Sequence, residues 1–301
     1  MDIFKKITHY IKNTDLYLVI LALLCSAYGM VLIYSATLNP ATALDGSTRN
    51  LFIQGAAVVI GLGAFVIMSL IDLETMSGWW KIFVLINIGL QMLLFTPLGV
   101  EVNGQRAWLN LGVTNLQPGE LGKLIFIFTL AAHISEIREH ISEWRGLFVI
   151  ALHTLIMMGA VVVASGDTGM AIQYFMIALI MLFAAGLSLK WLGAGFGLAL
   201  VSIPILWNFL LDDYQKTRIL VLFDPSIDPE TSRQATYGKI AIGSGQMSGE
   251  GLTHGTMTQM QMVPENHTDY IFSVAGEELG FIGCMLIIGL LTLLIARLFY
   301  V

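Results

Sequence analysis

The chain has 301 residues, of which 56% are hydrophobic and only 12% are charged, and its formal net charge is −6. A typical soluble domain carries roughly 25% charged residues, so this composition excludes a soluble fold, a disulfide-rich secreted scaffold and a disordered tail. Because there is no basic excess, nucleic acid is also excluded as a partner, and a polytopic membrane protein remains.

Eight segments have the length and composition of membrane-spanning helices, because a span needs about 20 mostly apolar residues. They are Leu16–Ser35, Leu51–Ile71, Trp79–Thr96, Leu121–Ile134, Leu147–Ala164, Gly169–Gly186, Trp191–Leu211 and Ile271–Ile295. The runs are continuously apolar and do not alternate, which favours helices over a β-barrel. The predicted fold is therefore all-α. The first apolar core is too long for a typical cleaved signal, so we expect an uncleaved anchor.

Lysine and arginine in short loops predict the orientation, because cytoplasmic loops carry an excess of both. The inner side would hold Lys5, Lys6, Lys12, Lys81, Arg138, Arg145, Lys190 and Arg297, and the outer short loops only Arg49 and Arg106. Both termini are then cytoplasmic.

Two connections in this chain are long, and such loops usually have a function. They are Pro97–Gly119 and Asp212–Thr268, and both are predicted to lie outside. Aromatic and aliphatic residues recur in the second, so we expect an ordered extracytoplasmic loop over residues 212–269, with short amphipathic helices. It lies within a single transmembrane domain of residues 1–301.

The informative polar residues gather on the outer side under this topology. Glu120 and Lys123 are three residues apart and share a helix face at the start of the fourth span. They predict the polar wall of a cavity that holds a charged ligand, or alternatively a pair that reaches to the membrane interface.

Asp269 stands where the long loop enters the eighth span. A carboxylate at the edge of a membrane cavity is partly desolvated, which makes it a better proton acceptor. The alternative is an N-cap of the eighth span. Glu277 lies eight residues further on and is expected either to line the same cavity or to form a hydrogen bond between helices.

Other polar residues allow two interpretations each. Arg106 suits recognition of phosphate or carboxylate, or it anchors the membrane interface together with Trp108. Asp167 could cap the sixth span. Cys25 and Cys284 lie in apolar runs and are expected to be packing residues, and the histidines show no metal-ligand spacing.

The order of several motifs resembles the SEDS family (shape, elongation, division and sporulation), and most closely its RodA branch. The motifs include Gly104-Gln105-Arg106-Ala107-Trp108, Gln117-Pro118-Gly119-Glu120-Leu121-Gly122-Lys123, Phe223-Asp224-Pro225, Ala241-Ile242-Gly243-Ser244-Gly245, Pro264-Glu265-Asn266-His267-Thr268-Asp269-Tyr270-Ile271-Phe272 and Glu277-Glu278-Leu279-Gly280-Phe281. Members of the family usually have ten spans, and the printed sequence contains eight predicted spans. Ser165-Gly166-Asp167-Thr168-Gly169 matches the family's proline-aspartate turn only loosely.

The resemblance implies a peptidoglycan glycosyltransferase of the bacterial cytoplasmic membrane. Such enzymes polymerise lipid II at the outer face and work with a class B penicillin-binding protein. The family's essential aspartate corresponds to Asp269 and its intramembrane pair to Glu120 and Lys123.

We therefore expect Asp269 to be the general base of an inverting transfer. Arg106, Lys123 and Arg218 are expected to stabilise the leaving pyrophosphate, with Glu120, His267 and Glu277 completing the substrate-binding site. No cofactor is required, although a divalent cation could share the stabilising role. The alternatives are a lipid II flippase and a non-catalytic scaffold for the penicillin-binding protein.

Overall fold

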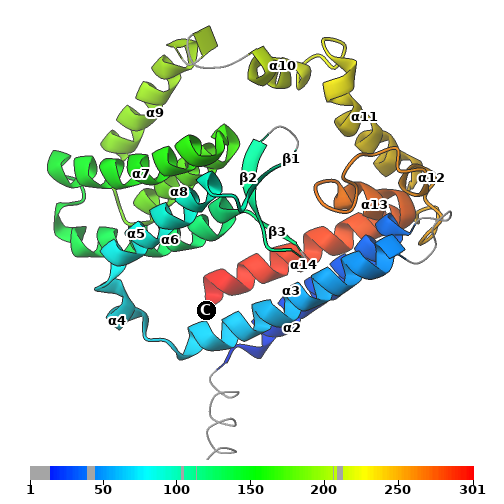
Figure 1. The fold of residues 1–301 in the computed structure, drawn as a ribbon, viewed down its shortest axis with the longest axis horizontal. Coiled ribbons are helices and arrows are strands. Elements are labelled where there is room, and N and C mark those ends of the chain that lie inside the picture. Colours follow the sequence, from blue (N-terminus) through cyan, green and yellow to red (C-terminus); the bar gives the residue numbers. More distant parts are fainter. Residues whose placement is uncertain (1–13, 39–44, 103–104, 113, 206, 209–212) are drawn as a thin grey trace, which may run out of the picture. The chain divides into compact units, whose positions relative to one another are not determined.

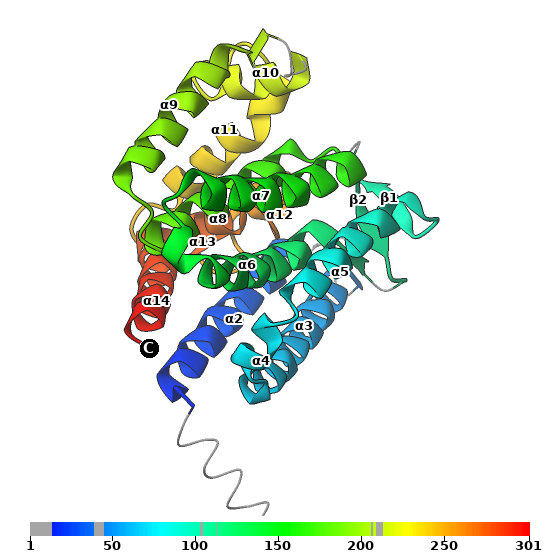
Figure 2. The same ribbon diagram turned by 90° about the vertical axis from the view of Figure 1, so that its left-hand side faces the viewer.

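The computed structural model describes residues 14–38, 45–102, 105–112, 114–205, 207–208 and 213–301, most of which are helical (Figures 1 and 2). Contacts between residues divide the chain into two compact units. Unit 1 consists of Met1–Phe65 and Leu211–Val301, and unit 2 consists of Val66–Leu210.

Four of the described helices are long and apolar enough to cross a membrane, and they correspond to the first, second, fifth and eighth predicted spans. They are α2 (Leu16–Thr37), residues Arg49–Leu70 of α3 (Asp45–Leu70), α7 (Trp144–Ser165) and α14 (Gly280–Tyr300). The other four predicted spans also correspond to helices, which are shorter, and the end of the seventh, Trp191–Leu211, lies partly outside the described residues. These helices are α5 (Trp80–Met92), α6 (Pro118–Glu136), α8 (Thr168–Ala184) and α9 (Leu189–Ile205).

Two adjacent residues explain where α7 ends and where α8 begins. Gly166 ends α7 with a φ of 69°, a left-handed conformation that glycine adopts readily. Asp167 then caps α8, because its carboxylate accepts the Met170 N–H at 2.8 Å. The prediction that Asp167 caps the sixth span is confirmed.

Helices α5, α6, α7 and α8 pack together in unit 2, and they run side by side in both views (Figures 1 and 2). Their apolar core includes Phe126, Leu130, Ile150, Met157 and Tyr174. Buried polar side chains fix the first turn of α6 by binding its backbone carbonyls. The Tyr174 hydroxyl donates to Gly119 O at 3.1 Å, Gln91 Nε2 to Pro118 O at 3.1 Å, and Asn87 Nδ2 to Gly122 O at 3.0 Å.

The Pro97–Gly119 connection forms a three-stranded antiparallel sheet, so the all-α prediction is wrong there. Its strands are β1 (Gly99–Val102), β2 (Gln105–Asn110) and β3 (Asn115–Leu116), in the order β1-β2-β3. Val100 pairs with Trp108, and Leu109 pairs with Leu116. Within β2, Ala107 and Leu109 are buried whereas their neighbours are more exposed, the period of two that a strand requires. A search for long apolar runs does not detect so short an alternation.

Unit 1 joins helices from the two ends of the chain. Helix α14 packs along α2, and Arg297 near the end of α14 holds Asp15 before α2 with Nε at 2.7 Å and Nη2 at 2.6 Å. The short helices expected in the long loop are present as α10 (Asp213–Val221), α11 (Pro229–Ser244) and α12 (Thr256–Gln259).

The eighth predicted span is not one continuous helix, which corrects the expectation for Ile271–Ile295. Helix α13 (Ile271–Glu278) ends before Gly280, whose φ is 66°, and α14 begins there. The break is stabilised because the Phe281 N–H at the start of α14 donates to Gln246 O at 2.8 Å instead of extending α13. Residues Ser273–Glu278 are all buried, so α13 is a core element of unit 1.

Candidate active site

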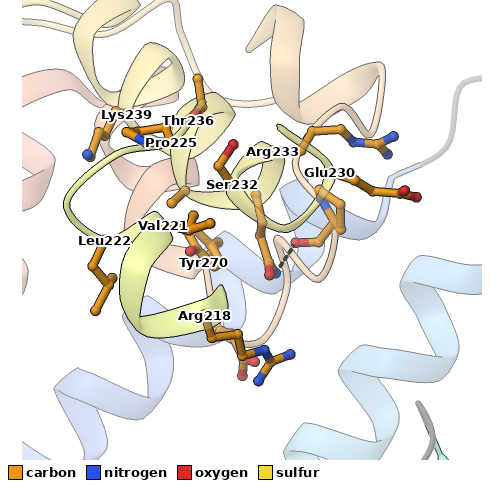
Figure 3. A pocket seen from close by; sticks show the side chains of 14 residues that line it. Arg218, Val221, Leu222, Pro225, Glu230, Ser232, Arg233, Thr236, Lys239 and Tyr270 are labelled. Atoms are coloured by element: carbon orange, nitrogen blue, oxygen red, sulfur yellow. Dashed lines mark hydrogen bonds between the residues drawn. The ribbon is translucent and has the colours of Figure 1, made fainter. Parts of the chain in front are cut away.

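A polar pocket of about 650 Å³ lies in unit 1 and contains Asp269 in its lining (Figure 3). Its walls come from α10, from α11 and from the segment before α13. The lining residues are Arg218, Val221, Leu222, Pro225, Glu230, Ser232, Arg233, Gln234, Ala235, Thr236, Lys239, Pro264, Asp269 and Tyr270. The structure therefore places Asp269 and Arg218, two residues predicted from the sequence, in one cavity.

The Asp269 backbone is held by a turn and by contacts with α11. Glu265 has a φ of 52°, and its carbonyl accepts the N–H groups of Thr268 and Tyr270, each at 3.2 Å. Gln234 on α11 donates to Pro264 O at 2.8 Å, the hydrogen bond drawn in Figure 3. The turn is thus attached to the helix that forms the opposite wall of the pocket.

Tyr270, which follows Asp269 in the sequence, lies directly against α11 because position 238 is a glycine. A Cβ at Gly238 would stand 2.8 Å from Tyr270 Cδ1, closer than packed carbon atoms approach. Tyr270 is also the N-cap residue of α13 and has no capping side-chain bond. The alternative prediction of Asp269 as N-cap is therefore wrong, and this residue is exposed and lines the pocket.

The pocket carries three cationic side chains and two acidic ones. Arg218 comes from α10, and Arg233 and Lys239 come from α11, while Glu230 and Asp269 are the acids. The sequence analysis missed the two cations on α11. Pro229 at the first helical position predicts where this helix starts, but the sequence does not show which of its residues line the pocket.

Glu277 lies apart from these lining residues and is fully buried. Its carboxylate accepts hydrogen bonds from the Met257 N–H, from the Thr258 N–H at 2.9 Å and from the Thr258 hydroxyl at 2.6 Å. Both oxygens are thus engaged by the first turn of α12. For Glu277 the sequence analysis offered two alternatives, lining the cavity or forming a hydrogen bond between helices, and these contacts correspond to the second. His267 is half-buried in the turn before Asp269 and does not line the pocket.

Unit 2 holds the remaining predicted residues. The Lys123 ammonium forms an ion pair with Glu120 at 2.7 Å and donates to Gln173 Oε1 on α8 at 2.6 Å. The Lys123 side chain is 19% exposed and that of Glu120 is 55% exposed. The expected pair is therefore formed, with the cation the more buried partner.

Arg106 also belongs to unit 2, on strand β2. Its Nη2 donates to Thr96 O at 3.0 Å, and the side chain is exposed. This bond connects the sheet to the residue that follows η1 (Leu93–Phe95).

The arrangement in unit 1 can perform proton transfer next to an anionic leaving group. A carboxylate can accept a proton from a hydroxyl, and guanidinium or ammonium groups stabilise developing negative charge. Across the described ranges, no group of three or more His, Cys, Asp or Glu side chains is placed to hold a metal ion.

Comparison with known proteins identifies the family. Residues 15–301 match the FtsW/RodA/SpoVE family, described as "Cell cycle protein". The chain is 34% identical over 281 residues to "Peptidoglycan glycosyltransferase MrdB" of Escherichia coli K12, covering 93% of this chain and 73% of that protein. It is 31% identical over 294 residues to "Probable peptidoglycan glycosyltransferase FtsW" of Geobacter metallireducens, covering 95% and 76%.

Two solved structures share the fold. One, reported as "Structural coordination of polymerization and crosslinking by a peptidoglycan synthase complex", has a TM-score of 0.75 at 29% identity and covers 96% of this chain and 78% of that one. Thermus thermophilus RodA has a TM-score of 0.62 at 26% identity, covering 96% and 75%. The chain therefore belongs to the SEDS family of peptidoglycan glycosyltransferases, multi-pass proteins of the bacterial cell membrane, which confirms the predicted family and enzyme class.

Proposed function

We propose that this protein polymerises lipid II into glycan strands at the outer face of the cytoplasmic membrane, with Asp269 as the general base. The observation that carries the proposal is the pocket that joins Asp269 to Arg218 in a member of this family. The proposal includes eight membrane spans, cytoplasmic termini and an extracytoplasmic pocket.

The chemistry is a single inverting displacement. The 4-hydroxyl oxygen of the acceptor sugar forms a bond to the anomeric carbon of the donor, and the bond from that carbon to the pyrophosphate breaks. Asp269 takes the hydroxyl proton, a step that typically contributes about 10²- to 10⁴-fold to the rate. Arg218 neutralises charge on the pyrophosphate. The same role for Lys123 and Arg106 stays a prediction from the sequence.

The proposed partner is a class B penicillin-binding protein that crosslinks the new glycan. The likeness to a chain from a peptidoglycan synthase complex supports this assignment. We propose a role in elongation on the motifs of the RodA branch. Relatives named MrdB and FtsW match at similar identities of 34% and 31%, and these identities do not distinguish the two branches. The elongation role therefore rests on the motifs alone.

The decisive experiment measures glycan formed from labelled lipid II by the purified chain in nanodiscs, with and without the partner. We expect Asp269→Asn to abolish polymer while the protein still folds. The matched control is Asp213→Asn, the same change at an exposed position of α10 outside the pocket lining. Wild-type polymer yield from Asp269→Asn would remove this residue from the mechanism. Movement of lipid II between leaflets without polymer would favour a flippase, and partner binding by an inactive wild type would favour a scaffold.

A further inference from the structure

The mechanism leaves two cations of the pocket without a role. Arg233 and Lys239 both extend from α11, line the cavity and are exposed to solvent. Neither forms an ion pair with any residue that the structure describes in unit 1. They are available to a ligand.

These cations do not converge with Arg218 on a single group. Arg233 and Lys239 are six residues apart, which separates them by about 9 Å along a helix. Figure 3 shows Arg218, Arg233 and Lys239 at three different sides of the pocket. One pyrophosphate at Arg218 therefore leaves the two α11 cations free for other anionic groups of an extended ligand.

The charges on this side of the pocket have both signs. Glu230 precedes Arg233 by three residues on α11 and also lines the cavity. Its carboxylate would repel a pyrophosphate, whereas a peptide that carries separate carboxylates and amines suits a surface with both signs. The volume of about 650 Å³ lies within the range of pockets that enclose a ligand larger than one sugar ring.

We propose that Arg233 and Lys239 bind carboxylates of the peptide attached to the lipid-linked disaccharide. They would then determine which substrate is bound, at a distance from the reacting bond. This inference rests on the proposed function, since it takes lipid II as the ligand.

The test measures binding rather than turnover. Full-length Asp269→Asn protein in nanodiscs is titrated with fluorescent lipid II, and in parallel with the same lipid whose peptide carboxylates are amidated. Adding Arg233→Gln or Lys239→Gln is expected to weaken lipid II binding about 3- to 10-fold, as fits a charged hydrogen bond at an exposed site. Binding of the amidated lipid should stay unchanged. The control is Lys216→Gln, an equal loss of charge on neighbouring α10 outside the pocket lining, which should affect neither lipid.

Two results would overturn the inference. An equal loss for both lipids would mean that the cations bind the pyrophosphate or support the fold, and no loss for either lipid would mean that they bind no part of the substrate. The proposed function fails by a different result, the absence of polymer from the wild-type protein with its partner, and polymer formation by Asp269→Asn removes only the assignment of the base. Neither result is a binding measurement, so the comparison of the two lipids stays separate from both.

Discussion

Replacing Glu277 with glutamine tests whether this buried carboxylate stabilises the fold or binds substrate. The carboxylate is fully buried and accepts three hydrogen bonds, one from Met257 and two from Thr258. A carboxamide oxygen can keep the two from Thr258, but its NH₂ group then faces the Met257 N–H. The Met257 N–H loses its acceptor and the new NH₂ group has none, at about 1–3 kcal/mol each, so we expect a loss of about 2–6 kcal/mol.

Thermal unfolding of the purified protein measures this loss. A domain of 150–250 residues shifts its Tm by about 2–4 °C per kcal/mol, so Glu277→Gln should lower the Tm by roughly 5 °C or more. Glu250→Gln is the matched control, because Glu250 also accepts from a backbone N–H and a hydroxyl, both of Thr256, but at the surface. The Glu250→Gln substitution should lower the free energy of unfolding by less than about 1 kcal/mol. An unchanged Tm for Glu277→Gln together with lost lipid II binding would refute the structural role.

Two further predictions concern unit 1. Gly245→Ala, directly after the end of α11, should strongly reduce the yield of folded protein, because its Cβ would overlap the Gly276 carbonyl. Gly243→Ala in the last turn of α11 meets no atom within 4 Å and should preserve the Tm. The Arg297 hydrogen bond lowers the pKa of Asp15, so this pair stabilises the fold above the unfolded pKa of about 3.9, and the contribution is lost as pH falls through the folded pKa. Asp15→Asn should therefore lower the Tm at pH 7, and the difference from wild type should shrink below about pH 4; an equal difference at both pH values would contradict the assignment.

The parts of the fold that could be predicted are those that depend on local composition. The predicted spans Leu16–Ser35 and Leu147–Ala164 nearly coincide with α2 and α7, because long apolar runs are sufficient to specify them. The break in Ile271–Ile295 was missed because apolar residues continue through it. It depends on Gly280 and on backbone groups of the loop that precedes α13, a tertiary contact that periodicity does not reveal.

The candidate site shows the same division. Glu120 and Lys123 could be paired from their spacing alone, and the structure forms that ion pair. Asp269 and Arg218 are 51 positions apart, and only the folding of α10 and α11 around the turn brings them into one pocket. Arg233 and Lys239 were missed because their placement depends on how α11 packs against α13 through Gly238.

The attachment of Glu277 to α12 has a consequence for inhibition. Helix α13 connects this carboxylate to the turn that carries Asp269, so the two sites share one short rigid element. A compound that displaced Met257 and Thr258 from the carboxylate would disturb the proposed base without occupying the pocket that contains it. Its inhibition would be noncompetitive toward lipid II, and resistance substitutions would arise around residues 255–259 rather than in the pocket.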